Sequence, residues 1–270
     1  MLHVLGATCS AEGVLGTKTY VTTPQGAHFV VLLFSLDGPL LACIEANLLG
    51  QIRTAATSGV ATRFLASPDA SVLGVIGSGF QARGQVEAIC AVRPIRQVRV
   101  HSRSKDRVGG FCEHMRRVVS VEIVACDTAR TAVEEADIVI TATTARTPVL
   151  RGEWLSQGVH VNAVGSNAAE RQEIDEETVR RAALVVVDDV GGAAQECGDL
   201  IAAERSGCFD WSRAHPLEDV VSGRWGRKAP SDVTLFESQG LASEDIAVAQ
   251  QVYNAAVAAR IGTPLPLSEL

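Results

Sequence analysis

From residue 71 onward, short and almost continuously apolar segments alternate with segments of helical length. The apolar segments read SVLGVIG, QVRVHS, VEIVAC, DIVITAT, HVNAVG and ALVVVDD. Strands of this kind lack the alternation of a half-exposed sheet and are typical of a parallel sheet that helices cover on both faces. We therefore predict an α/β domain with a doubly wound parallel sheet.

The two ends of the chain show a different pattern. Residues 20–44 favour strands, with YVTT, HFVVLLFS and LLACIEA arranged around a DGP turn, and predict a small antiparallel sheet. The alanine-rich segment 48–66 predicts a helix, which Pro68 and Asp69 end. Near the C-terminus, a strand and a glycine turn precede a helix opened by Ser243, and we expect this helix to return to the N-terminal domain.

Composition and charge narrow the class of protein. The net charge of -7 is spread without runs of like charge, which argues against nucleic acid and anionic membranes as partners. The longest apolar stretch is interrupted by Asp37, Gly38 and Pro39, and no signal peptide is recognisable, so we expect a cytoplasmic protein. The cysteines contain no CxxC pair and the histidines no HExxH motif, so neither a disulfide framework nor a metal site is predicted.

A glycine motif follows the first apolar segment of the α/β region directly. SVLGVIG runs into a helical segment through Gly77-Ser78-Gly79-Phe80-Gln81-Ala82. In this context Gly77 permits a tight turn, Gly79 lets the backbone approach a pyrophosphate, and Ala82 lets the helix pack closely on the strand. The start of the helix offers N–H groups to the phosphates. The motif predicts a Rossmann-type domain that binds NAD or NADP.

The end of the next strand bears on the choice of cofactor. An NAD enzyme usually carries an acidic residue about 20 residues after the glycine motif, where it binds the ribose 2′-hydroxyl. Here QVRV is followed by His101, Ser102, Arg103 and Ser104. The Arg103 guanidinium, flanked by two serine hydroxyls, is suited to a 2′-phosphate. This favours NADP(H), while NAD stays open if Arg103 only covers the adenine.

Several motifs together resemble the ornithine cyclodeaminase and mu-crystallin family. They are GTKTY, IRTAATSGVAT, GVIGSGFQARGQ, ADIVITATTARTPVL, VNAVGSNAAERQEID and TLFESQGLASEDIA. The resemblance implies a Rossmann domain, residues 69–231, inserted into a smaller α+β dimerisation domain, residues 1–68 and 232–270. It also implies a homodimer, a small amino or imino acid as substrate, and an active site between the domains.

The resemblance further implies roles for individual residues. Lys18 and Arg53 are the implied catalytic residues. Arg53 would bind the substrate α-carboxylate through two parallel hydrogen bonds, and Lys18 would hold the other polar end or supply a proton. Loops at the carboxyl ends of the strands are expected to hold the nicotinamide half of the cofactor. For that role we predict Thr141, Ala142, Thr143, Val164, Gly165, Ser166, Ser238 and Gly240.

Two departures from the family pattern bear on activity. Members that cyclise ornithine carry an aspartate in the loop after AVG, where this chain has Asn167, and an amide cannot accept a proton. This weakens ornithine deamination and favours a reductase, although Asp188, Asp189 and Asp245 are alternative bases. The chain also starts close to GTKTY and lacks a region that ordinarily supplies another substrate-binding arginine, which leads us to expect a smaller substrate or an incomplete start.

Three functions stay open at this point. The leading one is hydride transfer between NAD(P)H and the α-carbon of an imino acid, as in ketimine reductases or amino-acid dehydrogenases. The second is ornithine cyclodeaminase, which forms proline and ammonia with bound NAD. The third is a non-catalytic protein that binds NADPH and a small ligand. Net consumption of cofactor distinguishes the first from the second.

Overall fold

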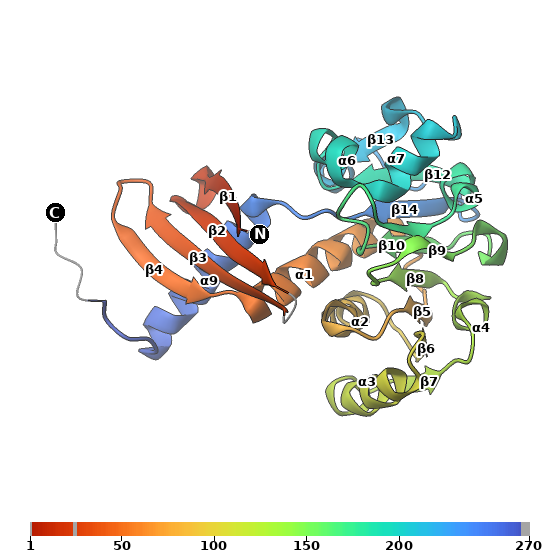
Figure 1. Cartoon of the computed structure of the whole chain (residues 1–270), viewed down its shortest axis with the longest axis horizontal. Coiled ribbons are helices and arrows are strands. Elements are labelled where there is room, and N and C mark those ends of the chain that lie inside the picture. Colours follow the sequence, from red (N-terminus) through yellow and green to blue (C-terminus); the bar gives the residue numbers. More distant parts are fainter. Residues whose placement is uncertain (1, 24–25, 266–270) are drawn as a thin grey trace. The chain divides into compact units, whose positions relative to one another are not determined.

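A computed structural model describes residues 2–23 and 26–265 (Figure 1). The chain forms two compact units. The terminal unit comprises Met1–Arg53 and Leu241–Leu270, and the central unit comprises Thr54–Gly240. Within the described ranges, no helix combines the length and the apolar composition that a membrane span requires.

The terminal unit is built on a four-stranded antiparallel sheet. Its strands follow each other in the order β1 (Leu2–Cys9), β2 (Val14–Thr23), β3 (Gly26–Ser35) and β4 (Leu40–Glu45). Helix α9 (Ala242–Ala259) packs against this sheet, as expected from the sequence (Figure 1). Strand β1 was not expected, because its own residues carry little strand pattern. It forms because it pairs with β2 along its whole length.

The two faces of this sheet differ. The face toward α9 contributes to a buried cluster that contains Val14, Val31, Leu33, Leu49 and Ile246. The strand register places a second set of apolar side chains on the opposite face, and these are exposed: Leu2, Val4, Val21 and Val30. The sheet therefore has one packed face and one apolar face open to solvent.

The central unit contains the predicted doubly wound sheet. All eight strands are parallel, in the order β13-β12-β14-β10-β8-β5-β6-β7. Their bounds are β5 (Val72–Ile76), β6 (Gln97–His101), β7 (Glu122–Ala125), β8 (Ile138–Thr141), β10 (His160–Ala163), β12 (Ala182–Val187), β13 (Ala214–Pro216) and β14 (Val233–Glu237). The prediction of an α/β fold is confirmed.

Helices and short elements complete the central unit. The helices are α2 (Phe80–Val92), α3 (Lys105–Val118), α4 (Ala129–Val133), α5 (Glu176–Arg181), α6 (Val190–Glu196), α7 (Gly198–Arg205) and α8 (Leu217–Val221). Two short strands, β9 (Arg146–Leu150) and β11 (Gln172–Ile174), pair with each other. Short 3-10 helices are η1 (Ser10–Glu12) in the terminal unit, and η2 (Gly152–Trp154) and η3 (Trp211–Arg213) in the central unit. One apolar cluster contains α2 and α3, and another contains α4 and α7.

The border between the units differs from the predicted boundaries at residues 68 and 232. Helix α1 (Asn47–Leu65) starts in the terminal unit and continues into the central unit. Its residues Ala61 and Leu65 share a buried cluster with Phe236 of β14. Strand β14, predicted from the sequence to belong to the terminal domain, lies between β10 and β12. Its burial on both faces suits the interior of a parallel sheet.

The strand order positions a ligand site. From β5 the chain proceeds outward to β6 and β7, and then returns to β8 on the other side of β5. In open parallel sheets, ligands bind in the crevice that such a reversal leaves at the carboxyl ends of the strands. The glycine motif lies at this point, between β5 and α2.

Candidate active site

The glycine loop has the conformation that the sequence motif predicts. Gly77 has a φ of 120°, and a Cβ at this position would collide with the carbonyl oxygen of Ala142. Gly79 is the N-cap of α2, where no side chain among the described residues caps the helix. A Cβ at Gly79 would project into space that holds no described atom within 4 Å. A helix start without a side-chain cap, next to open space, is suited to binding an anion.

A pocket of about 480 Å³ lies at this loop, next to the carboxyl ends of β5, β6, β8 and β10. The predicted cofactor residues that line it are Gly77, Ser78, Gly79, Phe80, Gln81, Ser102, Arg103, Ala142, Thr143, Val164 and Gly165. Its lining contains Arg103, Arg107 and Arg171 and, among the described residues, no carboxylate. Size, charge and the open space at Gly79 all fit a dinucleotide.

Arg107 was not singled out from the sequence. Helix α3 begins after Ser104, whose hydroxyl accepts a hydrogen bond from the backbone N–H of Arg107 at 3.4 Å. This cap places Arg107 in the first turn of the helix, and its side chain lines the same pocket as Ser102 and Arg103. The signal available in the sequence was a basic residue three positions after a serine N-cap.

Other predicted cofactor residues lie outside the lining of this pocket: Ala82, Ser104, Thr141, Ser166, Ser238 and Gly240. Ala82 is fully buried in the cluster that contains α2, as the predicted close packing requires. The hydroxyl of Thr141 donates to Glu173, and that of Ser166 donates to Glu237. These hydroxyls hold buried carboxyl groups, and their roles in cofactor binding stay predictions.

Three buried carboxyl groups lie behind the loops of the pocket. Glu173 accepts hydrogen bonds from the backbone N–H groups of Thr143 and Gly165, and so joins two loops that line the pocket. Burial raises the pKa of Glu173, and raises that of Asp199 to about 7. Burial and the charge of Asp199 raise the pKa of Glu237 well above its usual range. The sequence offered no signal for this group, because the three residues lie on separate elements.

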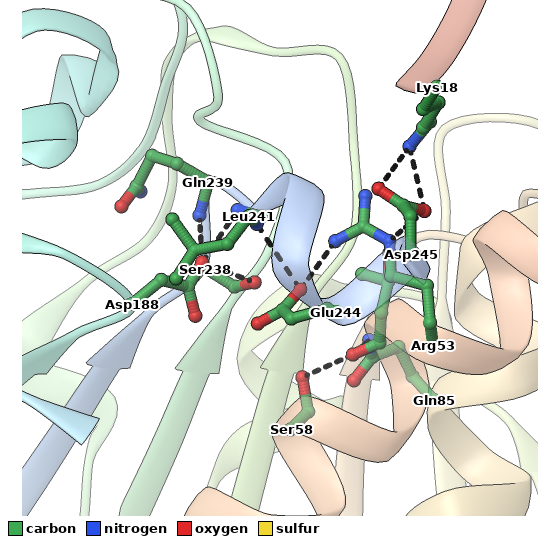
Figure 2. Close-up of polar contacts among 12 residues, drawn as sticks. Lys18, Arg53, Ser58, Gln85, Asp188, Ser238, Gln239, Leu241, Glu244 and Asp245 are labelled. Atoms are coloured by element: carbon green, nitrogen blue, oxygen red, sulfur yellow. Dashed lines mark hydrogen bonds and ion pairs between the residues drawn. The ribbon is translucent and has the colours of Figure 1, made fainter. Parts of the chain in front are cut away.

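Asp188 and Asp189, two of the three alternative bases, accept hydrogen bonds from backbone N–H groups. Asp188 accepts hydrogen bonds from the hydroxyl of Ser238 and the backbone N–H groups of Gln239 and Gly240, the latter at 2.6 Å (Figure 2). Asp189 caps α6 by accepting from the backbone N–H of Gly192. Both carboxylates therefore shape loops, which favours structural roles over proton transfer.

Asn167, which the resemblance compares with the aspartate of ornithine-cyclising members, lies in the loop between β10 and β11. Its side-chain oxygen accepts a hydrogen bond of 2.7 Å from Arg171, and both residues line the pocket. The amide thus contributes a neutral, hydrogen-bonded group at this position and offers no base.

In the terminal unit, Lys18 and Arg53 both contact Asp245 of α9, and Arg53 also contacts Glu244 (Figure 2). Nζ of Lys18 lies 3.1 and 3.0 Å from the two carboxylate oxygens of Asp245. Nε of Arg53 lies 2.9 Å from Oδ1 of Asp245, and its Nη1 lies 2.7 Å from Oε2 of Glu244. We call these four residues the cation cluster. The structure brings the two predicted catalytic residues together, and it adds Glu244 and Asp245 to them.

The side chain of Lys18 is buried. It projects from β2 on the face that packs against α9, with the rings of Tyr20 and Phe29 at 5.8 and 5.3 Å from Nζ. Burial lowers the pKa of Lys18, and the positive charge of Arg53 lowers it further, while Asp245 opposes both effects. An ammonium group whose pKa lies below its ordinary value is suited to proton transfer.

Known proteins match this chain along almost its whole length. The ornithine cyclodeaminase/mu-crystallin family model matches residues 13–260. A Delta(1)-pyrroline-2-carboxylate reductase of Bacillus cereus (strain ZK / E33L) is 38% identical over 264 residues, which are 93% of this chain and 81% of that protein.

Two solved structures share the fold. Thermococcus litoralis Delta(1)-pyrroline-2-carboxylate reductase, in complex with NADH and L-proline, has a TM-score of 0.89 and 33% identity, over 98% of this chain and 90% of that one. An archaeal alanine dehydrogenase dimer with bound NAD has a TM-score of 0.90 and 29% identity, over 97% and 83%. Together with the glycine loop and the parallel sheet, these matches show that the chain belongs to the ornithine cyclodeaminase/mu-crystallin family.

Proposed function

We propose that this protein is an NAD(P)H-dependent oxidoreductase that reduces a small cyclic imino acid to the corresponding amino acid. The observation that carries the proposal is the cation cluster, in which Lys18 and Arg53 both contact Asp245. A cyclic imino acid presents a carboxylate beside an imine nitrogen, and two neighbouring cationic side chains suit these two groups. The Bacillus cereus and Thermococcus litoralis relatives bear the name of a reductase for such a substrate.

The two cations have separate roles in this proposal. The guanidinium of Arg53 binds and orients the α-carboxylate, because a planar fork of N–H donors matches a carboxylate. Two of its nitrogens already face Glu244 and Asp245, so the substrate must share the guanidinium with these side chains or replace one of them. Nζ of Lys18 donates a proton to the imine nitrogen, and its lowered pKa favours the transfer.

The glycine-loop pocket holds the cofactor in this proposal. Gly77, Gly79 and the first turn of α2 would bind the pyrophosphate, and Thr143 and Gly165 would lie along the nicotinamide half. When bound, the nicotinamide supplies the hydride that the substrate carbon receives. The chain's contribution is to hold both reactants in place.

We favour NADP(H) over NAD(H). Arg103 and Arg107 line the pocket at the end of β6, where the lining contains no carboxylate among the described residues. A carboxylate at this position would repel a 2′-phosphate, whereas two guanidinium groups attract it. The solved relatives named above contain NADH and NAD, so the preference of this chain requires a direct test.

We also propose a homodimer. The open face of the terminal sheet exposes Leu2 and Val4 by 63% and 61%, together with Val21 and Val30. A monomer rarely leaves such a contiguous apolar face in water. The archaeal alanine dehydrogenase with a similar fold is a dimer. Size-exclusion chromatography with light scattering tests this, and a monomer at micromolar concentration would contradict it.

The reaction is tested by following the absorbance of NADPH or NADH with a panel of cyclic imino acids, among them pyrroline-2-carboxylate, and with keto acids plus ammonia. We expect stoichiometric loss of reduced cofactor with a cyclic imino acid, and loss of that activity in Arg53→Ala. A parallel reaction with ornithine and catalytic NAD measures ammonia. Ammonia release without net redox change would identify a cyclodeaminase, and tight NADPH binding without any turnover would favour a binding protein.

A further inference from the structure

We infer that Asp245 is a positioning residue of the proposed reductase: its carboxylate holds the ammonium of Lys18 and the guanidinium of Arg53 side by side for the substrate. This inference rests on the proposed function for its purpose. The geometry that supports it is independent of that function, because the contacts are all formed within the terminal unit.

Asp245 contacts both cations at once. Its two carboxylate oxygens receive Nζ of Lys18 at 3.1 and 3.0 Å, and its Oδ1 also lies 2.9 Å from Nε of Arg53 (Figure 2). The side chain is only 1% exposed. A buried carboxylate with these contacts has little freedom to move, so it determines where the two cationic groups lie relative to each other.

The negative charge of Asp245 stabilises the two neighbouring cations of the cluster. The side chains of Lys18 and Arg53 are 5% and 11% exposed, so their mutual repulsion is weakly screened by water. The charged groups that act on Lys18 are Arg53 of α1 and Glu244 and Asp245 of α9. Without the charge of Asp245, the two cations would stay buried with Glu244 as the remaining carboxylate of the cluster, which is strongly unfavourable.

Glu244 contacts a different set of groups from its neighbour Asp245. It contacts Arg53 at 2.7 Å and accepts a hydrogen bond from the backbone N–H of Leu241, and it is 18% exposed. No contact between Glu244 and Lys18 is found among the described residues, and the charge of Glu244 contributes least to the pKa of Lys18. Glu244 is therefore the matched control for Asp245: both are carboxylates in the first turn of α9 that contact Arg53.

The decisive measurement is the titration of Lys18 by NMR in protein labelled at the lysine ε-carbon. The sequence contains Lys18, Lys105 and Lys228 as its lysines, and a Lys18→Arg variant identifies the signal of Lys18. We expect Lys18 to titrate at a lower pH in Asp245→Asn than in the wild type, and to stay close to the wild type in Glu244→Gln. The signals of Lys105 and Lys228 serve as internal references. An unchanged titration of Lys18 in Asp245→Asn would overturn the inference.

Activity supplies the second readout. With pyrroline-2-carboxylate as the probe, Asp245→Asn is expected to lower kcat/KM by about tenfold or more, equivalent to about 1.4 kcal/mol. The basic limb of its pH profile is expected to move to lower pH together with the titration of Lys18. An activity loss with an unshifted pH profile would indicate a merely structural role and overturn the inference.

A second variant covers the case in which Asp245→Asn does not fold. Asp245→Glu keeps the charge but moves the carboxylate by one methylene, so Lys18 should titrate near its wild-type pH while KM for the imino acid rises severalfold. Wild-type KM in Asp245→Glu would show that position is unimportant and overturn the inference. If the Lys18 titration shifts as expected but the wild type reduces no imino acid, the proposed function fails while the charge coupling stands.

Discussion

Nζ of Lys18 lies 3.0 Å from Oδ2 of Asp245, although the two residues are 227 positions apart in the sequence. Strand β2 presents the lysine and the first turn of α9 presents the aspartate, and both lie on the packed face of the terminal sheet. The cation cluster therefore forms only when the two ends of the chain fold together. Changes in the packing of α9 on this sheet should affect substrate binding.

Gly79→Ala is expected to weaken dinucleotide binding by about tenfold or more, which corresponds to about 1.4 kcal/mol. A methyl group here meets no described atom within 4 Å, so the fold should tolerate it, but it would occupy space that the pyrophosphate needs. Fluorescence titration with NADPH and thermal unfolding measure the two effects. The control is Gly110→Ala in α3, which should bind NADPH normally. Normal affinity in Gly79→Ala would contradict the assignment of the pyrophosphate site.

Arg103→Ser is expected to reduce the affinity for NADPH by roughly 10- to 100-fold, because one charge-assisted hydrogen bond contributes about 1.5–3 kcal/mol. The affinity for NADH should change by about twofold or less, since it carries no 2′-phosphate. Isothermal titration calorimetry with both cofactors gives the ratio. The control is Arg96→Ser, because Arg96 is exposed and lies outside the pocket lining. Equal losses for both cofactors would instead assign Arg103 to the adenine.

Glu244→Gln is expected to lower KM for the imino acid by about fivefold, corresponding to about 1 kcal/mol. The carboxylate of Glu244 lies on Nη1 of Arg53, where a substrate carboxylate would compete with it, and an uncharged amide competes less. Steady-state kinetics and the dissociation constant of L-proline measure the effect. Glu12→Gln, an exposed change in the same unit, is the control. A higher KM would show that Glu244 supports substrate binding rather than opposing it.

Glu237→Gln is expected to make stability less dependent on pH. A carboxyl group whose pKa is raised in the folded state binds protons more tightly there, so its stabilising effect is complete below the unfolded pKa and is lost as pH rises through the folded pKa. For Asp199 that window runs from 3.8 to about 7, and for Glu237 it runs from 4.5 to well above that value. The amide of the variant keeps a hydrogen-bonding group and removes the charge.

Urea unfolding at about pH 5 and about pH 8 tests this prediction. The loss of unfolding free energy between these two conditions should be smaller in Glu237→Gln than in the wild type. Glu196→Gln, a change at an exposed carboxylate, should behave as the wild type. An equal pH dependence in all three proteins would show that Glu237 is ionised in the folded state at neutral pH.

The local sequence pattern was sufficient to predict several features of the fold. Apolar strands separated by helical segments predicted the doubly wound sheet, because burial on both faces leaves a signal within each strand. The glycine motif predicted the conformation of the loop after β5, since Gly77 needs a positive φ and Gly79 a close approach of the backbone. Lys18 and Arg53 were found through resemblance to a family, since no spacing in the sequence relates one to the other.

Tertiary structure decided what depends on contacts between distant segments. Strand β1 forms because β2 offers a partner, and the border between the units falls inside α1 because Leu65 packs with Phe236. The bridging role of Asp245 was equally invisible, because acidic residues in a first helical turn are common whether or not they meet a cation. Periodicity reports which face of an element is buried. It carries no information about which distant charge lies across that face, and that pairing creates the cation cluster.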